Sequence, residues 1–221
     1  MKLLLNALIK FIMGLLLVGG LLFLPAGGFG YRNGWLFLGL LFIPMLLLGL
    51  VLFIKAPGLL EKRLGAKEKE GAQKGVVAAS GLLFVAGFVV AGLDYRFGWS
   101  QLPLWAVITA SGVLLVSYGL YAEVMRENAY LSRTVEVQAG QKVVDKGLYG
   151  IVRHPMYAVT LWLFLSIPLV LGSWWALLCF APYLVIIVIR ILNEEKLLEK
   201  ELEGYTDYEK RVKYRLFPFI W

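Results

Sequence analysis

Charged residues and metal-binding side chains are scarce in this sequence. Only 17% of the 221 residues are charged, whereas 60% are hydrophobic, and the mean hydropathy is +0.75. A soluble globular domain carries about 25% charged residues, so this composition argues for a membrane protein. The single cysteine, Cys179, excludes an intramolecular disulfide and fits a small core residue. The single histidine, His154, argues against a metal site.

Several motifs of soluble enzymes are also missing. The stretch from Gly27 to Gly30 neither follows a strand nor opens a phosphate-binding helix, so it predicts a turn and not a dinucleotide site. No serine lies in a nucleophile elbow. The net charge of +7 could indicate nucleic acid binding, but the cations lie in short segments beside apolar runs, where anionic lipid headgroups explain them better.

Long apolar runs are what the sequence has in abundance. Crossing a bilayer core about 30 Å thick takes roughly 20 apolar residues. The runs that meet or approach this length are 3–24, 34–54, 76–95, 103–123, 155–171 and 174–192. The first run is long, contains Lys10 and has no clear cleavage site, so it predicts a retained span and not a signal peptide. We predict an all-α, polytopic transmembrane helical bundle of about six spans, in which the last two form a short helical hairpin.

Lysines and arginines predict the orientation of this bundle. With the N-terminus in the cytoplasm, 20 of the 22 lie in segments on the cytoplasmic side, and only Arg32 and Arg96 lie on the other. This asymmetry is what the positive-inside rule requires, and the opposite orientation would invert it. We therefore predict an integral membrane protein, of the cell or inner membrane if the source is prokaryotic, with both termini in the cytoplasm.

Polarity divides the chain into two regions. Residues 1–123 contain the first four predicted spans. A polar segment then runs for about thirty residues from Glu123 to His154, which is too long for a mere connector in a compact protein. We predict a transmembrane bundle over residues 1–123 and a catalytic region over residues 124–221. The catalytic region consists of the polar segment, the hairpin 155–192 and a charged C-terminal tail.

His154 and Pro155 mark the start of the fifth predicted span. Proline suits the first helical position because its missing N–H costs nothing there, and it pushes His154 into the capping position. The free N–H groups and the positive end of the helix dipole would then face an anionic group such as a carboxylate. A capping histidine beside a proline is more often structural than functional, so this feature alone does not establish a site.

Arg190 and Glu194 close the last predicted span. They are four residues apart and lie on one face of a continuous helix. Ionisable residues at the edge of a span are costly unless they snorkel, pair or serve a site, so an interfacial ion pair and a functional pair both fit. The glutamates that follow are predicted to form a solvated helix face: Glu195, Glu199, Glu201 and Glu203.

The tail from Tyr205 to Trp221 mixes tyrosines with cations and ends in an apolar stretch. This composition fits a segment that folds back onto the membrane surface. A lid over a site and a plain interfacial anchor are both open interpretations.

In combination, these clusters resemble the isoprenylcysteine carboxyl methyltransferase family, and related phospholipid methyltransferases share much of the pattern. The resemblance rests on Gly-x-Tyr-x-x-x-Arg-His-Pro-x-Tyr at 147–157, Arg-x-x-x-Glu-Glu-x-x-Leu at 190–198 and Tyr-x-x-Tyr-x-x-x-Val at 205–212. No single element is specific, but their order is. The first four spans resemble the family only in hydrophobicity.

The resemblance implies an S-adenosylmethionine site that has no Rossmann domain and is capped by the C-terminal segment at the cytoplasmic face. Arg190 would lie on the methyl-acceptor side, and Glu194 would orient Arg190 or receive a polar group of the cofactor. The other cofactor-binding residues that the resemblance implies are Gln141, Lys142, Val143, Val144, Tyr149, His154, Pro155, Met156 and Tyr157. The family commonly has a histidine near the position of Gln141, and a Phe-Gly pair before the tail tyrosines, where this chain has Leu202, Glu203 and Gly204.

The implied chemistry makes few demands on side chains. Methyl transfer from a sulfonium is an in-line displacement, so the enzyme chiefly holds donor and acceptor together and excludes water. A carboxylate acceptor is ionised at neutral pH and needs a cation such as Arg190 to place it, whereas an amine acceptor must lose a proton. The sequence leaves an isoprenylcysteine-type carboxylate and a phospholipid-type amine both open.

Two other functions fit parts of the pattern. Sterol reductases resemble the C-terminal region and bind a nicotinamide cofactor there, but they are typically longer and have more spans. A transporter or scaffold is a third alternative, and the scarcity of ionisable residues deep within the first four spans counts against an ion or proton pathway. We predict a membrane methyltransferase with S-adenosylmethionine as cofactor, a lipophilic or lipidated acceptor, and neither a metal nor a nucleic acid partner.

Overall fold

The computed structural model describes residues 2–65, 71–131 and 137–221, and every regular element in these ranges is helical. The first half of the chain forms α1 (Lys2–Ala26), α2 (Arg32–Lys55), α3 (Pro57–Gly65), α4 (Gly71–Phe97) and α5 (Leu104–Glu127). The second half forms η1 (Gly147–Gly150), α6 (Pro155–Val170), α7 (Trp174–Phe180), α8 (Tyr183–Glu201) and α9 (Tyr205–Arg211). The predicted all-α polytopic bundle is confirmed. Residues 132–136 of the predicted polar segment lie outside the described ranges.

Among the described residues, five helical segments are long and apolar enough to cross a membrane. They are α1, α2, α5, the part of α4 from Lys74 to Phe97, and the combined segment Trp174–Glu201. The fifth predicted span, α6, has 16 residues and is a shorter apolar helix. It packs along α5 and beside α7.

The last helical segment differs from its prediction in two ways. It continues to Glu201, well beyond the expected end at residue 192, so the second arm of the hairpin is not short. It is also interrupted between α7 and α8, where Pro182 has no N–H to donate and the chain makes i→i+3 bonds from Leu184 and Val185 instead. The turn of the hairpin lies at Gly172 and Ser173, as predicted, with Gly172 at a φ of 78°.

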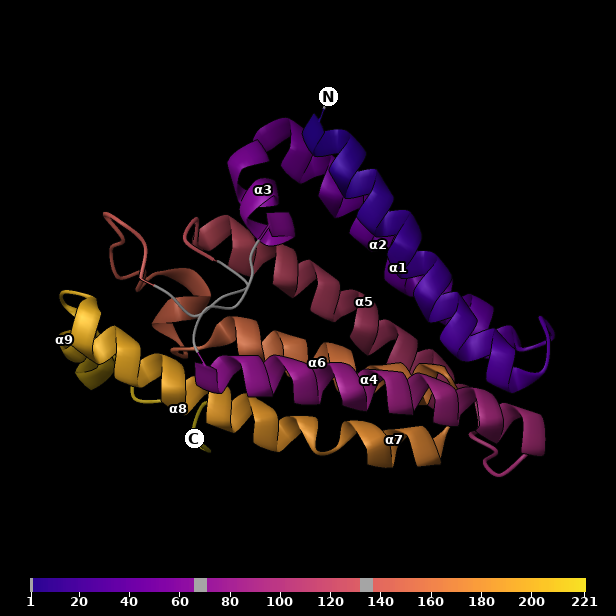
Figure 1. Cartoon of the computed structure of the whole chain (residues 1–221). Coiled ribbons are helices and arrows are strands. Elements are labelled where there is room, and N and C mark those ends of the chain that lie inside the picture. The colour runs from indigo at the N-terminus through magenta and orange to yellow at the C-terminus, as the bar shows by residue number, and fades with distance from the viewer. Residues whose placement is uncertain (1, 66–70, 132–136) are drawn as a thin grey trace.

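Figure 1 shows how the helices place the two kinds of connection at opposite ends of the bundle. The turns between α1 and α2, α4 and α5, and α6 and α7 lie together at one end, which we call the turn end. The start of α1, α3, the described residues between α5 and α6, and the tail lie at the other end, which we call the polar end. The described parts of the segments predicted to be cytoplasmic therefore reach the same end of the molecule.

The main hydrophobic core lies toward the turn end, where α1 and α4 approach most closely. A Cβ on Gly92 would lie 2.5 Å from the carbonyl oxygen of Leu22, so glycine is what allows this contact. Phe37, Phe180 and Leu114 are fully buried in the same cluster. From this contact the helices diverge, and in Figure 1 the α1–α2 pair rises away from α4 and α6 toward the polar end.

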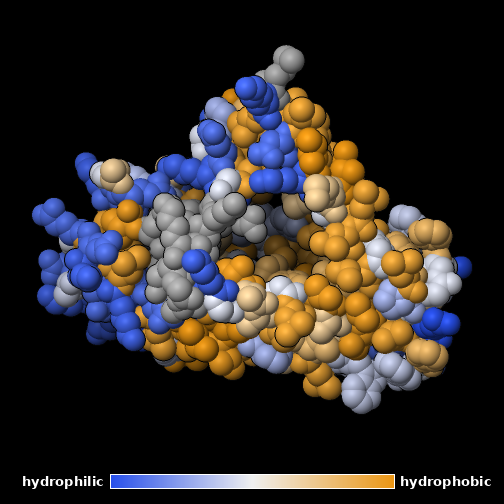
Figure 2. Space-filling view, viewed as in Figure 1, coloured by the Kyte–Doolittle hydropathy of each residue, from blue (hydrophilic) through white to orange (hydrophobic). Residues whose placement is uncertain are grey.

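The hydropathy of the surface also distinguishes the polar end from the rest of the molecule. In Figure 2 hydrophobic residues cover the middle of the molecule, whereas hydrophilic residues gather at the polar end around α8 and α9. The view also shows a hollow between the α1–α2 pair and the lower helices. The apolar outer faces of the helices suit contact with lipid.

Candidate functional site

A cavity of about 670 Å³ lies between the diverging helices at the polar end. One end is apolar, with walls that include residues of α2 and of the α6–α8 hairpin: Leu41, Met45, Leu48, Leu52, Leu163, Phe164 and Tyr183. The other end is polar and is enclosed by the segment before α6, by α8 and by the tail. The cavity thus joins a place for a polar group to a place for a hydrocarbon chain.

Hydrogen bonds order the segment that forms the polar wall. The side-chain amide of Gln138 donates to the carbonyl of Tyr130 at 2.6 Å, and the backbone N–H of Gln138 donates to Oε1 of Gln141 at 2.9 Å. The side-chain amide of Asn128 donates to the Tyr149 hydroxyl at 3.0 Å. These bonds hold Gln141, Lys142, Val143 and Val144 at the cavity wall, although none of these four residues lies in regular structure.

Gly147 fixes the start of η1 against the end of α5. Its φ is 57°, and a Cβ there would lie 1.7 Å from the carboxylate of Glu127. That carboxylate instead accepts the amide hydrogen of Leu148, with distances of 2.9 and 3.1 Å to its two oxygens. The glycine of the sequence motif is therefore required by a close approach as well as by its backbone conformation.

Tyr149 links η1 to the tail. Its side chain borders the cavity, and its carbonyl accepts a hydrogen bond of 2.8 Å from the hydroxyl of Tyr208 in α9. Burial raises the pKa of both phenols above their ordinary value, so both stay protonated at neutral pH. The hydroxyl of Tyr208 uses its hydrogen in the bond to Tyr149, whereas the hydroxyl of Tyr149 accepts from Asn128 and keeps its own hydrogen to donate.

His154 is the N-cap residue of α6 and Pro155 is its first residue, as predicted. The capping is made by the backbone alone, because the imidazole makes no cap hydrogen bond. The buried ring lies with Nε2 3.1 Å from Oε1 of Glu195. A carboxylate can only accept, so Nε2 carries the proton in this contact.

Arg190, Tyr157 and Glu194 form one hydrogen-bonded group on the wall of the cavity. Nε of Arg190 donates to the hydroxyl of Tyr157 at 2.9 Å, and this hydroxyl donates to the carboxylate of Glu194. Arg190 and Glu194 do share one face of α8, as predicted. The tyrosine of α6 bridges them, so the two helices of the hairpin are joined at the level of the cavity.

The prediction that Glu195 lies on a solvated helix face is wrong, because only 2% of its surface is exposed. Its carboxylate binds Arg153 at 2.9 Å, His154 at 3.1 Å and Arg215 at 2.7 Å. Arg153 also pairs with Glu209 of α9 at 2.8 Å. The other three glutamates of the predicted face are exposed, as expected: Glu199, Glu201 and Glu203.

The tail closes the polar end of the cavity. The amides of Arg153 and His154 each donate at 2.9 Å to the carbonyls of Tyr214 and Arg215. Further wall residues come from the tail and from the turn before it: Leu202, Tyr205 and Tyr208. The end of the tail is different, since Phe219 is 88% exposed and Ile220 is 81% exposed. The tail therefore has one part that closes the cavity and an apolar end suited to the membrane surface.

Two buried polar atoms at this wall have no hydrogen-bond partner among the described residues. They are Nε of Arg153 and the hydroxyl oxygen of Tyr205. Both residues border the cavity, and both are at least nine-tenths buried. A buried donor without a partner costs about 1–3 kcal/mol, and the surrounding contacts of these residues must offset this cost.

The structure brings nearly all the predicted site residues to this one cavity. Those that border it are Gln141, Lys142, Val143, Val144, Tyr149, His154, Met156, Tyr157, Arg190 and Glu194. Pro155 is buried and does not border the cavity, so its part is to set the start of α6.

Several wall residues were not singled out from the sequence: Arg63, Asn128, Arg153 and Tyr121. Arg153 could have been found from its position directly before His154 and Pro155. Arg63 lies in α3, a helix that was not predicted from the sequence. Within the described ranges, no group of three His, Cys, Asp or Glu residues is arranged to hold a metal ion.

The fold and this cavity define a polytopic membrane protein in which a polar site and an apolar channel meet at one end of the bundle. Residues 105–203 match the model of the phospholipid methyltransferase family, which includes isoprenylcysteine carboxyl methyltransferases. The match agrees with the resemblance found in the sequence, since this region is similar to phospholipid methyltransferases.

A partial similarity to a reductase is also present. The chain is 27% identical over 99 residues to Delta(14)-sterol reductase TM7SF2 of Mus musculus, and the alignment covers 40% of this chain. It covers only 22% of the length of the reductase. The similarity therefore concerns a shared segment and not the whole enzyme.

Proposed function

We propose that this protein transfers a methyl group from S-adenosylmethionine to a lipophilic acceptor within the membrane. The observation that carries this proposal is the single cavity in which the predicted cofactor residues and Arg190 meet an apolar channel. The family matched by residues 105–203 generally uses this cofactor. The catalytic region of the proposal is residues 124–221, with α2, α3 and α5 adding cavity walls.

The cofactor would lie against the polar wall formed by the segment before α6, the start of α6 and the tail. Gln141, Tyr149 and Glu194 offer polar groups there, and Val143 and Met156 offer apolar contact. When bound, the cofactor supplies an electrophilic methyl group on a positively charged sulfur.

Arg190 would place the acceptor. Its guanidinium is held by the Tyr157 hydroxyl, which is itself fixed by Glu194, so the cation has a defined position at the boundary between the polar and apolar parts. The acceptor's nucleophilic atom forms the new bond to carbon as the carbon–sulfur bond breaks, and the electron pair stays on the departing sulfur. The side chains position the reactants and exclude water, which is sufficient for such a displacement.

The polar end of the bundle would face the cytoplasm in this proposal. The N-terminus, α3 and the tail lie toward that end, and the segments predicted to be cytoplasmic contain 20 of the 22 lysines and arginines of the chain. The water-soluble cofactor could then reach its wall from the cytoplasm, and the acceptor's hydrocarbon chain could enter from the lipid.

The partial similarity to a sterol reductase supports one alternative, in which the same polar wall binds a nicotinamide cofactor. Calorimetric titration of the detergent-purified protein with S-adenosylmethionine, S-adenosylhomocysteine and NADPH separates the candidates. We expect both adenosyl compounds to bind and NADPH not to bind. Binding of NADPH alone would establish the reductase, and binding of none of them would favour a non-enzymatic role.

A further inference from the structure

The last residues of the tail turn back toward the bundle. Figure 1 shows the chain doubling back from α9, so that its final residues lie beside α8. Leu216 is buried in a hydrophobic cluster with residues of α6 and α8. The ring of Phe217 packs on Trp162 of α6, with 6.1 Å between the ring centres. Residues 216–221 therefore form a loop against the outer side of the helical hairpin, which we call the tail loop.

The contact with Trp162 places the tail loop beside the apolar surface of the bundle. Trp162 lies two turns after Pro155, the first residue of α6, so it is about 10 Å along the helix from the polar end. Its side chain is 54% exposed and faces outward. In the tail loop, Phe219 is 88% exposed and Ile220 is 81% exposed. Amphipathic elements at a bilayer surface bury apolar side chains to a depth of about 5–10 Å, which matches this position.

The backbone of the tail loop forms hydrogen bonds with itself. The backbone oxygen of Trp221 accepts the N–H groups of residues 215–217 at 2.9, 3.0 and 3.3 Å. The carbonyl of Phe217 accepts the N–H groups of Ile220 and Trp221 at 3.2 and 3.3 Å. Pro218 has no N–H that needs a partner. Backbone groups that meet lipid must be bonded within the protein, so these internal bonds suit a position in the membrane interface.

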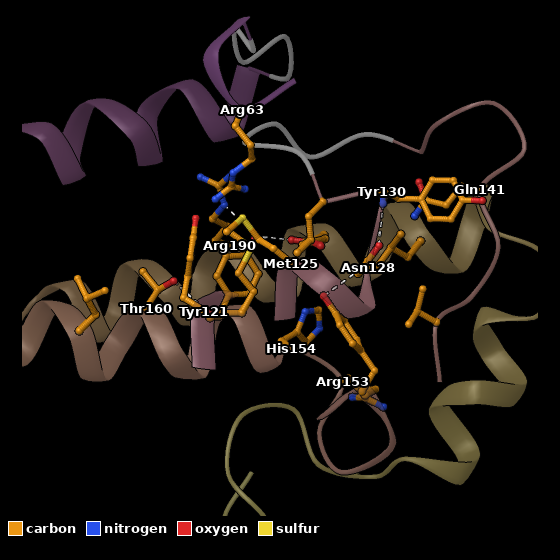
Figure 3. Close-up of a pocket in the computed structure, with 18 of the residues that line it drawn as sticks. Arg63, Tyr121, Met125, Asn128, Tyr130, Gln141, Arg153, His154, Thr160 and Arg190 are labelled. Carbon is orange, nitrogen blue, oxygen red and sulfur yellow. Dashed lines mark hydrogen bonds between the residues drawn. The ribbon is translucent and has the colours of Figure 1, made fainter. Parts of the chain in front are cut away.

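Arg215 joins the tail loop to the wall of the cavity. Its Cζ lies 5.1 Å from the centre of the Trp221 ring, and its N–H donates to the backbone of the same residue. Its Nε donates to Glu195 at 2.7 Å, and its carbonyl accepts the N–H of His154 at 2.9 Å. In Figure 3 His154 and Arg153 lie close together at the cavity, and both side chains bind Glu195. A shift of the tail loop would therefore move a residue that closes the polar end.

We propose that the tail loop is embedded in the lipid interface and that this contact holds Arg215 on Glu195, which keeps the polar end of the cavity closed. The partner is the bilayer surface, at the boundary between headgroups and acyl chains, and Phe219 and Ile220 are the anchoring side chains. The tail loop continues the apolar outer face of α6 at Trp162, so the lipid around the bundle also covers the loop. The inference goes beyond the proposed function and requires no particular cofactor.

The position of the tail loop is tested with a fluorescent label in the full chain. Cys179, the only cysteine, is replaced by serine, and Ile220→Cys is labelled with nitrobenzoxadiazole in phosphatidylcholine nanodiscs. We expect a blue-shifted emission and quenching by lipids that carry a nitroxide near the headgroup end of the acyl chain. The same label at Glu203→Cys, an exposed site before α9, is the control and should show neither. Equal emission at the two sites would overturn the inference, as would a blue shift without quenching, which indicates contact with a second copy of the chain.

The effect of the lipid contact on closure is tested by the rate at which trypsin cleaves the tail in nanodiscs, for example after the exposed Lys213. The double variant Phe219→Ser, Ile220→Ser should be cleaved about tenfold faster, because the loss of two anchoring side chains favours the detached tail. Phe29→Ser is the matched control, since Phe29 is 74% exposed at the turn end, and it should leave this rate unchanged. An unchanged rate in the double variant would overturn the inference, and so would an equal increase in Phe29→Ser.

A double-mutant comparison shows whether the lipid contact acts through Arg215 and Glu195. Glu195→Ala alone should already raise the cleavage rate, because it removes the acceptor of Arg215. Adding Phe219→Ser and Ile220→Ser should then raise the rate by less than about twofold, since both changes release the same contact. Independent effects that multiply would overturn the assigned route. These rates are measured without S-adenosylmethionine, so this inference and the proposed function can each fail while the other holds.

Discussion

The carboxylate of Glu195 lies 2.7 Å from Nε of Arg215, and this pair joins the helix that borders the cavity to the tail that closes it. The same carboxylate binds Arg153 and His154, which immediately precede α6. One buried side chain thus connects α8, the start of α6 and the tail. These are the elements that enclose the polar end of the cavity.

Replacing Glu195 should loosen the tail. Glu195→Ala removes the shared acceptor from two buried or half-buried arginines, and breaking a buried pair in this way costs about 3–5 kcal/mol. We expect a lower Tm in detergent and faster proteolytic cleavage within residues 202–221. Glu199→Ala, on an exposed face of the same helix, is the control and should change neither. Unchanged cleavage in Glu195→Ala would show that the tail is held without this carboxylate.

Glu194 and His154 should each contribute to the affinity for the cofactor. Both border the polar wall, so Glu194→Ala and His154→Ala are expected to weaken S-adenosylmethionine binding by about tenfold or more, the effect of losing one hydrogen bond to a charged group. Calorimetric titration measures this. His154→Ala also removes a contact to Glu195, so its Tm must be compared with that of Glu195→Ala. Normal affinity in both variants would place the cofactor elsewhere.

Arg190 should act on turnover and not on cofactor affinity. It lies at the boundary of the channel and is held by Tyr157, so Arg190→Ala is expected to bind S-adenosylmethionine normally and to lose turnover of an identified acceptor. The loss should be about 100-fold or more, as for a removed positioning group. Turnover that survives in Arg190→Ala would contradict the assigned role. Arg190→Lys keeps the charge but not the bidentate edge, and it should recover only part of the rate.

Gly147→Ala tests the close approach at the start of η1. The new Cβ would meet the carboxylate of Glu127, and the φ of 57° disfavours any side chain there. We expect weaker S-adenosylmethionine binding, because the shift of η1 would move Tyr149 at the cavity wall. Gly112→Ala is the comparison, since a Cβ at that position meets nothing within 4 Å. If the two variants behave alike, the approach of Glu127 does not position this wall.

The attachment of the tail should weaken in alkaline solution. Burial raises the pKa of Tyr208, whose hydroxyl donates to the carbonyl of Tyr149, above the ordinary value near 10. A group with a raised pKa in the folded state contributes stability below its unfolded pKa, and this is lost as the pH rises above about 10. Cleavage of the tail should therefore increase above that pH. Phenylalanine cannot ionise, so cleavage of the tail in Tyr208→Phe should increase less with pH. At neutral pH the tail of this variant should already be cleaved faster, because the hydrogen bond to Tyr149 is missing.

Hydrophobicity and local rules predicted most of the scaffold. The apolar runs located the spanning helices, and Pro155 located the start of α6 with His154 as its cap. The four-residue spacing placed Arg190 and Glu194 on one face of α8. Each of these features depends on residues close together in the chain, which is why the sequence alone was sufficient to predict them.

The errors came from contacts between distant segments. Glu195 was expected in solvent because its own helix is charged, yet its partners Arg153 and Arg215 come from the segment before α6 and from the tail. Helical spacing contains no information about such partners. The apolar α2 wall and Arg63 were missed for the same reason, since their relation to the cavity appears only when the helices pack. The interruption at Pro182 did have a local signal, the missing N–H of proline.

The cavity is built from two stretches of chain that are far apart in sequence, one from α2 and α3 and the other from α5 onward. For protein engineering, this separation makes the chain a suitable host for chimeras. Residues 41–63 could be exchanged for those of another membrane protein to alter which lipid is accepted, while the hydrogen-bonded wall around Tyr149 and Glu195 stays intact. The close contact of Gly92 with Leu22 lies at the other end of the bundle, outside the exchanged residues, whereas Phe42 belongs to the main core and would have to be kept.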